Sequence, residues 1–172
     1  MYTYHPVVEI LVKSFGTTPQ SLEPLHEQLL AYRENTEGLK EAMLKHKVTG
    51  ESEFQQALAA YYELEYRDNF NDVPVVREFT EFIPIRYAKK NIFFPLKKTR
   101  NTLEVAITNP ELSQPLDDLA RHFKCHIQSV ISHKQAVLDL INRAYDESSA
   151  STEDAVDLLD SEETYENILA VE

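Results

Sequence analysis

Residues 93–145 constrain the fold more than any other stretch of this sequence. Two short apolar segments, 93–97 and 103–108, are separated by the polar residues 98–102. This pattern is typical of a β-hairpin, in which two half-buried strands are joined by a loop of turn-prone residues. Asn109-Pro110 ends the second strand, because proline cannot donate to a β-ladder and the residue before it avoids the helical region.

A helix, a third strand and a second helix are predicted to follow. Ser113 is placed to cap the first helix and Pro115 suits its first turn. Residues 126–131 alternate as a strand does, and Ser132 is an N-cap candidate for the second helix. The apolar face of the first helix comprises Leu116, Leu119, Ala120 and Phe123. That of the second comprises Ala136, Val137, Leu140, Ile141 and Ala144. The order predicts a β-β-α-β-α module of two layers, with both helices covering one face of the sheet.

The preceding residues 21–66 predict a compact set of helices with short connections. Ser21 is expected to cap a helix that runs to about Arg33, and Asn35 opens the next one. After a turn at Gly50, Ser52 is expected to cap a third helix. Its buried line is predicted to contain Phe54, Ala57, Leu58, Tyr61 and Leu64.

Residues 1–20 are interpreted as an N-terminal arm or helix. Val7, Ile10, Leu11 and Phe15 fall on one side of a helix, which indicates packing on the domain. The alternative is an arm that docks on another protein.

Candidate interface residues come from this arm and from the end of the third helix. Tyr62 and Tyr66 are four residues apart and would share an exposed helical side, where aromatic residues are natural interface anchors. The alternative for this pair is packing against residues 73–76. We take Leu11, Phe15, Tyr62 and Tyr66 as the candidate partner interface.

The net charge of −12 is concentrated in a C-terminal tail at 146–172. This tail contains ten acidic residues and no Lys or Arg, which leaves 19 acids against 17 bases in the rest of the chain. Neither part has the basic surface that nucleic-acid binding requires. We predict a disordered acidic linker or tail, attached to a domain at 21–145 whose sheet module spans 80–145. The fold class is therefore α+β.

The sequence offers no catalytic, cofactor or metal site. Its three glycines stand alone, whereas phosphate-binding loops need several close together. His122, Cys125 and His126 supply one thiol and straddle a helix end and a strand start, so a zinc site is not indicated. Cys125 is interpreted as a small buried hydrophobe. There is no apolar run long enough to span a bilayer and no signal peptide, so a cytoplasmic protein that is not an enzyme is expected.

Several segments together resemble a known family. They are Phe94-Pro-Leu, Leu103-Glu-Val-Ala-Ile-Thr-Asn-Pro, Leu116-Asp-Asp-Leu, Ser129-Val-Ile-Ser and Ile141-Asn-Arg-Ala-Tyr145. Over residues 22–146 the chain resembles the N-terminal domain of type II secretion ATPases (GspE-type), a domain shared with type IV pilus assembly ATPases.

The resemblance implies a non-catalytic adaptor that docks a motor onto an inner-membrane platform protein. The implied partners are the cytoplasmic domain of that platform protein (GspL-like) and the C-terminal ATPase motor of a parent chain, with no nucleic acid and no membrane insertion. The implied location is cytoplasmic and peripheral to the inner membrane. The alternatives are a cyclic di-GMP sensor of the same family or a stand-alone interaction module. Family members that bind the dinucleotide use repeated Arg-Leu-Gly motifs, and residues 21–90 contain none.

Overall fold

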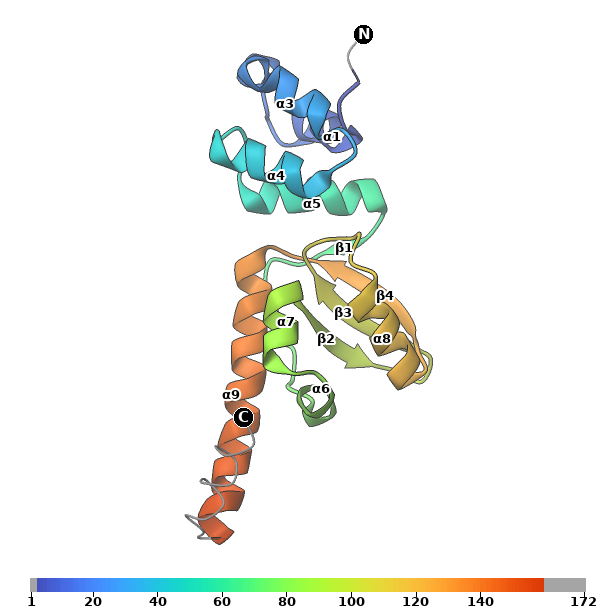
Figure 1. Ribbon diagram of the computed structural model, residues 1–172, viewed down its shortest axis with the longest axis vertical. Coiled ribbons are helices and arrows are strands. Elements are labelled where there is room, and N and C mark those ends of the chain that lie inside the picture. Colours follow the sequence, from blue (N-terminus) through green and yellow to red (C-terminus); the bar gives the residue numbers. More distant parts are fainter. Residues whose placement is uncertain (1–2, 160–172) are drawn as a thin grey trace.

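The computed structural model describes residues 3–159, with side chains described for 3–147. Helices alone form the first half of the chain (Figure 1). They are α1 (Pro6–Ser14), α2 (Pro19–Leu22), a 3₁₀ turn (Glu23–Leu25), α3 (His26–Ala31), α4 (Thr36–Lys45) and α5 (Glu51–Tyr62). We call this part the helical half.

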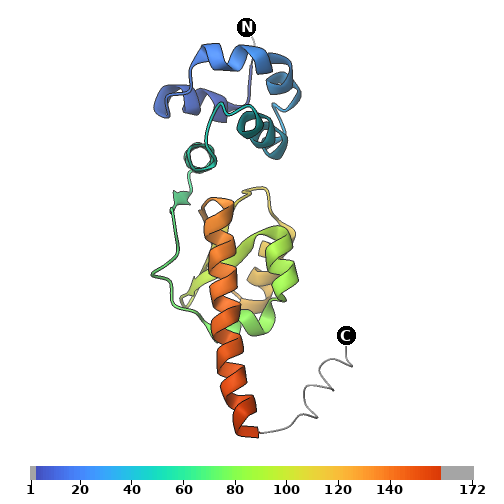
Figure 2. The same cartoon turned by 90° about the vertical axis from the view of Figure 1, so that its left-hand side faces the viewer.

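The second part, the sheet half, contains a four-stranded sheet with helices packed on it (Figures 1 and 2). Its elements are β1 (Glu65–Tyr66), α6 (Arg77–Phe82), α7 (Ile85–Asn91), β2 (Phe93–Lys98), β3 (Thr102–Ile107), α8 (Gln114–Phe123), β4 (His126–Ile131) and α9 (Lys134–Leu159). The predicted α+β class and the order strand, strand, helix, strand, helix are confirmed. The strand β1 and the helix α6 are additions that the sequence did not indicate.

The strand order in the sheet is β1-β4-β3-β2. Strands β2 and β3 form the predicted antiparallel hairpin, with Phe93 opposite Ile107. Strand β4 returns parallel to β3 through α8, and the two residues of β1 pair with the end of β4. A parallel pair needs such a crossover, and a helix is its usual form. Because β1 directly follows α5, this pairing also ties the helical half to the sheet.

A single hydrophobic core runs through both halves. In the helical half it includes the fully buried Leu11, Leu39 and Phe54, and in the sheet half Phe93 and Ile107. The apolar stripe predicted for α9 is entirely buried, because each of its five residues is at most 5% exposed. Burial of apolar area on this scale is the main force that holds the chain together.

The helix starts only partly follow the capping predictions. Asn35 caps α4 as expected, since its side chain accepts a hydrogen bond from the Gly38 N–H at 3.0 Å. The prediction that Ser21 caps a helix is wrong: the helix begins at Pro19, and Thr18 accepts the N–H of Ser21. Pro19 suits the first helical position because its missing N–H is not needed there.

The predictions for Ser52 and Ser132 are also wrong. Helix α5 already begins at Glu51, after Gly50, so Ser52 lies inside it and hydrogen-bonds the Tyr66 hydroxyl at 2.8 Å. His133 caps α9 in place of Ser132, because its Nδ1 accepts the Ala136 N–H at 3.3 Å. Ser113 precedes α8 as predicted, but its side chain makes no capping hydrogen bond.

Helix α5 ends earlier than its apolar pattern suggested. Glu63 adopts a left-handed conformation (φ 56°) and stops the helix after Tyr62. The prediction that Tyr62 and Tyr66 share a helical side is therefore wrong, since Tyr66 lies in β1. Tyr61, predicted to be in the core, is 42% exposed.

Helix α9 passes the predicted domain boundary at Tyr145. Its backbone remains helical to Leu159, and no glycine or proline stands in residues 146–159 to stop it. The first part of the expected linker thus continues the helix in the structure. The rest of that prediction, at 160–172, lies outside the described residues. In the described part of the chain, no helix is long and apolar enough to cross a bilayer.

Candidate partner-binding surfaces

Three large apolar side chains are exposed among residues 3–147. They are Tyr61 at 42%, Phe82 at 37% and Ile85 at 37%. Tyr61 is in the last turn of α5, whereas Phe82 and Ile85 flank the bend between α6 and α7. Exposed aromatic and apolar groups of this size are the usual anchors of protein interfaces. The chain therefore presents two candidate surfaces, one in each half.

The first candidate, which we call the aromatic surface, consists of His5, Tyr61 and Tyr62. The ring of Tyr61 meets His5 edge-on at 5.1 Å between centroids and Tyr62 edge-on at 4.9 Å. Such edge-to-face pairs add to the stabilisation from area burial alone and fix the orientation of the rings. Tyr61 is thus held in place by its neighbours while much of its surface faces solvent.

Two hydrogen bonds fix the partners of Tyr61. His5 caps α1 through its Nδ1, which accepts the Val7 N–H at 3.2 Å. The Tyr62 hydroxyl donates to Glu111 at 3.4 Å, in the loop after β3. Burial lowers the pKa of His5, and Glu111 only partly opposes this. Burial, reinforced by Glu111, raises the pKa of Tyr62. His5 and Tyr62 are therefore both neutral at pH 7.

The second candidate is a cleft of about 380 Å³ between the α6–α7 bend and α8, which we call the apolar cleft. Phe82 stacks on His122 at its rim, with 3.7 Å between ring centroids. The Tyr87 hydroxyl donates to Asp118 at 3.1 Å, and the pKa of Tyr87 is raised by burial and by this carboxylate. The apolar lining includes Phe82, Pro84, Tyr87, Phe93, Pro115 and Leu119.

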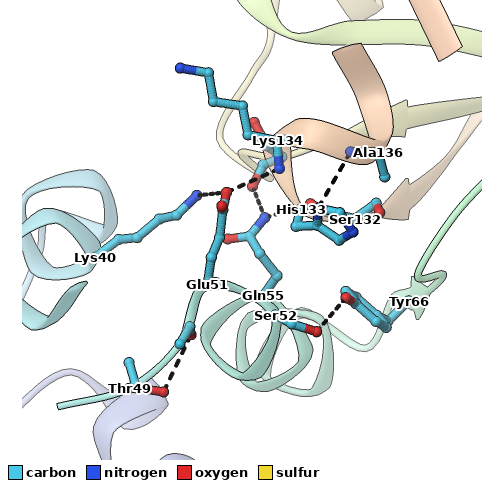
Figure 3. A network of polar contacts seen from close by, with 12 residues as sticks. Lys40, Thr49, Glu51, Ser52, Gln55, Tyr66, Ser132, His133, Lys134 and Ala136 are labelled. Atoms are coloured by element: carbon cyan, nitrogen blue, oxygen red, sulfur yellow. Dashed lines mark hydrogen bonds and ion pairs between the residues drawn. The ribbon is translucent and has the colours of Figure 1, made fainter. Parts of the chain in front are cut away.

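A polar network joins the two halves (Figure 3). Gln55, fully buried in α5, donates from Nε2 to the carbonyl oxygens of Thr108 at 2.9 Å and Ser132 at 2.8 Å. Both partners can only accept, so the amide nitrogen must face them. One side chain of the helical half thus binds the ends of both β3 and β4.

Glu51, one turn earlier in α5, bridges the same junction. It accepts the Lys134 N–H at 3.0 Å, at the start of α9, and lies 3.3 Å from the Lys40 ammonium (Figure 3). Burial would raise the pKa of Glu51, but the Lys134 N–H and the Lys40 charge outweigh it and hold the pKa below its ordinary value. Placing a carboxylate at the N-terminus of α9 is also favourable to the helix dipole.

The four interface residues predicted from the sequence do not form one surface. Leu11 is 0% exposed in the core of the helical half, so it is not accessible to a partner. Phe15 is half-buried beside a separate hollow lined by Gly16 and Val48. Tyr62 belongs to the aromatic surface, and the half-buried Tyr66 hydrogen-bonds Ser52. The arm at the N-terminus is helix α1, packed on α5, which corresponds to the first of the two predicted alternatives.

The principal exposed anchors were missed by the sequence reasoning. Tyr61 was assigned to the core line of α5, and Phe82 belongs to a helix that was not predicted. Only the proline at position 84, which forces a bend between two apolar segments, could have indicated the exposed turn.

The structure leaves Cys125 without a catalytic arrangement. It is buried, as predicted, and its Sγ contacts the carbonyl oxygen of Phe123 at 3.3 Å. Among the side chains described for residues 3–147, no three His, Cys, Asp or Glu residues are grouped as metal ligands would be.

Residues 62–151 match the model of the MshEN domain. The chain belongs to the MshEN domain family. The matched residues run from the end of α5 into α9 and cover more than half of the chain. This confirms the resemblance to the N-terminal domains of secretion and pilus ATPases drawn from the segments in 94–145.

One curated relative of this MshEN protein is the type IV pilus assembly ATPase PilB of Myxococcus xanthus. The two are 26% identical over 148 residues, which is 86% of this chain and 25% of PilB. The chain thus spans about a quarter of the length of this relative.

Two solved structures have the same fold. The structure of MshE with cdg has a TM-score of 0.62 and 18% identity, and the likeness covers 81% of this chain and 98% of the other. The N-terminal domain of XpsE has a TM-score of 0.58 and 18% identity, with coverage of 83% and 98%. At this identity the likeness shows the fold alone.

Proposed function

We propose that this MshEN protein is a non-catalytic adaptor that docks an ATPase motor onto the cytoplasmic domain of an inner-membrane platform protein. The observation that carries the proposal is the family match of residues 62–151, taken with relatives in which such a domain belongs to a secretion or pilus ATPase. The protein would work in the cytoplasm, peripheral to the inner membrane through its partner. The motor domain would belong to a parent chain or act in trans.

The aromatic surface supplies the docking contact in this proposal. Tyr61 offers a large, partly apolar ring whose orientation is already fixed by His5 and Tyr62, so little conformational entropy is lost on binding. Tyrosine is among the residues that contribute most to interfaces. A single ordered aromatic anchor next to the junction of the two halves suits an adaptor that holds one protein against another.

The test is a binding titration between this chain and the cytoplasmic domain of the platform protein. Tyr61→Ala should weaken binding by roughly thirtyfold, the effect of losing a central anchor worth about 2 kcal/mol. The matched control is Ile85→Ala, which removes an exposed apolar side chain from the other half and should leave the affinity unchanged. Absence of binding by the unaltered chain would overturn the adaptor proposal. Equal binding by the Tyr61→Ala variant would overturn the choice of surface.

A second candidate function is binding of a cyclic dinucleotide. The observation that favours it is the structural likeness to MshE, whose structure was determined with cdg. Against it stands the absence of any Arg-Leu-Gly tripeptide in residues 21–90. Calorimetric titration with cyclic di-GMP separates the two: saturable heat would assign this function to the chain, and no heat at high micromolar ligand would remove it.

A further inference from the structure

The apolar cleft has features that the adaptor proposal does not use. Its lining is mostly aromatic and aliphatic, and Phe82 at its rim remains 37% exposed. A monomeric protein gains by covering such a surface, because each Å² of apolar area removed from water contributes about 25 cal/mol. The cleft is on the sheet half, apart from the aromatic surface around Tyr61.

Positive charge surrounds the cleft. Arg121 lies at its rim, and Arg86, Lys89 and Lys90 are exposed on α7 beside it. None of these four cations takes part in an ion pair with another described residue. Of the acidic groups close by, Glu81 pairs with Arg77 at 2.9 Å, whereas Asp118 accepts the Tyr87 hydroxyl and keeps its negative charge in the lining. The four cations outnumber this one carboxylate. The occupant that fits is apolar on one side and acidic on the other.

Residues 160–172 of this chain have that chemistry. Tyr165, Ile168 and Leu169 are spaced so that they share one side of a helix. The segment also contains five acidic residues and no Lys or Arg. An amphipathic helix that binds in an apolar groove is a common mode of peptide recognition. Its apolar anchors are three and four residues apart, as Tyr165, Ile168 and Leu169 are.

The segment can reach the cleft. The Tyr145 hydroxyl donates to the carbonyl oxygen of Ile83, which lines the cleft, so α9 passes it at that level. From Tyr145 to Leu159 the helix rises about 21 Å, at ~1.5 Å per residue. From Leu159 to Tyr165 an extended chain of six residues spans up to about 20 Å, and the helical turn from Tyr165 to Ile168 adds about 4.5 Å. The apolar residues at 168 and 169 can therefore return to the cleft.

We propose that residues 160–172 dock in the apolar cleft of the same chain, with Ile168 and Leu169 against Phe82 and the acidic residues toward Arg121 and α7. Tethering favours this occupant, because the segment is present at an effective concentration of the order of millimolar. A docked segment covers Phe82, so that any other ligand of the cleft must displace it. The proposal does not depend on the adaptor function, which uses the other half.

The test uses the 172-residue chain, which contains no tryptophan. In the variant Tyr165→Trp, the indole fluorescence reports the surroundings of the segment alone. We expect blue-shifted emission and protection from acrylamide quenching. Adding Arg121→Glu should shift the docking equilibrium by about fivefold toward the open form, the upper end of what one exposed charge pair contributes. The emission should then move to longer wavelength and the quenching constant should increase.

A matched control and a rescue keep the test specific. Arg33→Glu reverses an equally exposed cation in the helical half and should leave the emission unchanged. Restoring opposite charges with Arg121→Glu and Glu163→Lys together should recover part of the protection. Raised salt should weaken docking in the unaltered background, because exposed charges are screened within about 10 Å at 0.1 M.

Three outcomes would overturn the proposal. One is fully solvent-exposed emission that is indifferent to Arg121→Glu. Another is protection that grows with protein concentration, which would place the segment in the cleft of a second copy. The third is solvent-exposed emission together with binding to vesicles containing phosphatidylserine that Arg121→Glu abolishes, which would assign the cleft to a membrane surface.

Discussion

His5 combines three roles at one residue: it caps α1, packs against Tyr61 and lies near Glu111. Its Nδ1 accepts a backbone N–H and so carries no proton while the cap is formed. Burial, which lowers the pKa of His5, couples this arrangement to pH. Protonation removes the cap acceptor and places a charge in a site with little access to water.

The stability of the protein should therefore fall as the pH drops from the ordinary histidine pKa of about 6.5 toward the lower folded-state pKa of His5. A lowered folded-state pKa means that the unfolded chain binds more protons in this window, so the contribution of His5 is present above it and lost below. His5→Gln should flatten this part of the curve of unfolding free energy against pH, measured by urea denaturation. The same substitution at the exposed His46 is the control and should leave the slope as it is.

Ser132 shows how the same residue can be assigned two opposite roles. As an N-cap its hydroxyl would stabilise α9, and Ser132→Ala would cost about 1 kcal/mol. In the structure the hydroxyl is buried and has no hydrogen-bond partner among the described residues, while His133 forms the cap. Removing an unsatisfied buried hydroxyl is neutral or stabilising.

Ser132→Ala should thus change the unfolding free energy by less than about 0.5 kcal/mol or increase it. His133→Ala removes the cap of α9 and the hydrogen bond from its Nε2 to the Asp68 carbonyl, 2.8 Å long. It should cost about 1 kcal/mol. Equilibrium denaturation of both variants checks the assignment, and the reverse order of effects would contradict it.

Helix α5 is the element on which the arrangement of the two halves depends. It packs against α1, leads into β1, and carries Gln55 to the ends of β3 and β4 and Glu51 to the start of α9. The helix begins after its N-cap Gly50 and ends at its C-cap Glu63, which adopts a left-handed conformation. These two limits determine which residues of α5 face the sheet. A shift of one residue would turn Gln55 away from the two carbonyl groups that it satisfies.

Gln55→Ala should destabilise the protein by about 1–3 kcal/mol, because two buried carbonyl oxygens lose their donor. The neighbouring Gln56 is only half-buried and bonds Ser52 within the same helix, so Gln56→Ala should cost much less. Thermal unfolding compares the two variants. Equal losses would mean that the two carbonyl hydrogen bonds contribute little to stability.

At the scale of the whole molecule, the two halves share a core and a polar junction. Glu51 contributes to that junction only while it is ionised, and its pKa is lowered in the folded state. The contribution is therefore present above the ordinary glutamate pKa and is lost as the pH falls through the lower folded-state value. Acidification should loosen the junction before it disrupts the shared hydrophobic core.

Glu51→Gln should lower stability at pH 7 by up to about 1 kcal/mol, a modest amount because the side chain is partly exposed and screened. The difference from the unaltered chain should shrink as the pH falls from the ordinary glutamate pKa through the lowered folded-state pKa, and vanish below it, where the carboxylate is protonated in both states. Glu53→Gln, two residues away and exposed, is the control. A difference that persists at low pH would show that the side chain stabilises the junction without its charge.

The sequence predicted the elements that depend on residues close together in the chain, and it missed those that depend on contacts between distant elements. The β2–β3 hairpin, β4 and the stripes of α8 and α9 follow from local periodicity and from proline, so they could be read directly. The caps at Thr18 and His133 could not, because several polar residues at each helix start compete and packing selects among them. The two-residue strand β1 has no periodic signal of its own and forms only because β4 lies beside it.

By itself the sequence determined the α+β class, the order of β2, β3, α8, β4 and α9, and the resemblance to the family. These depend on apolar spacing and turn residues that act within a few positions along the chain. The tertiary structure alone decided which tyrosine is exposed, that Leu11 is inaccessible, and where the apolar cleft opens. Exposure depends on which elements pack together, and those contacts join residues far apart in the sequence, such as Gln55 and Ser132.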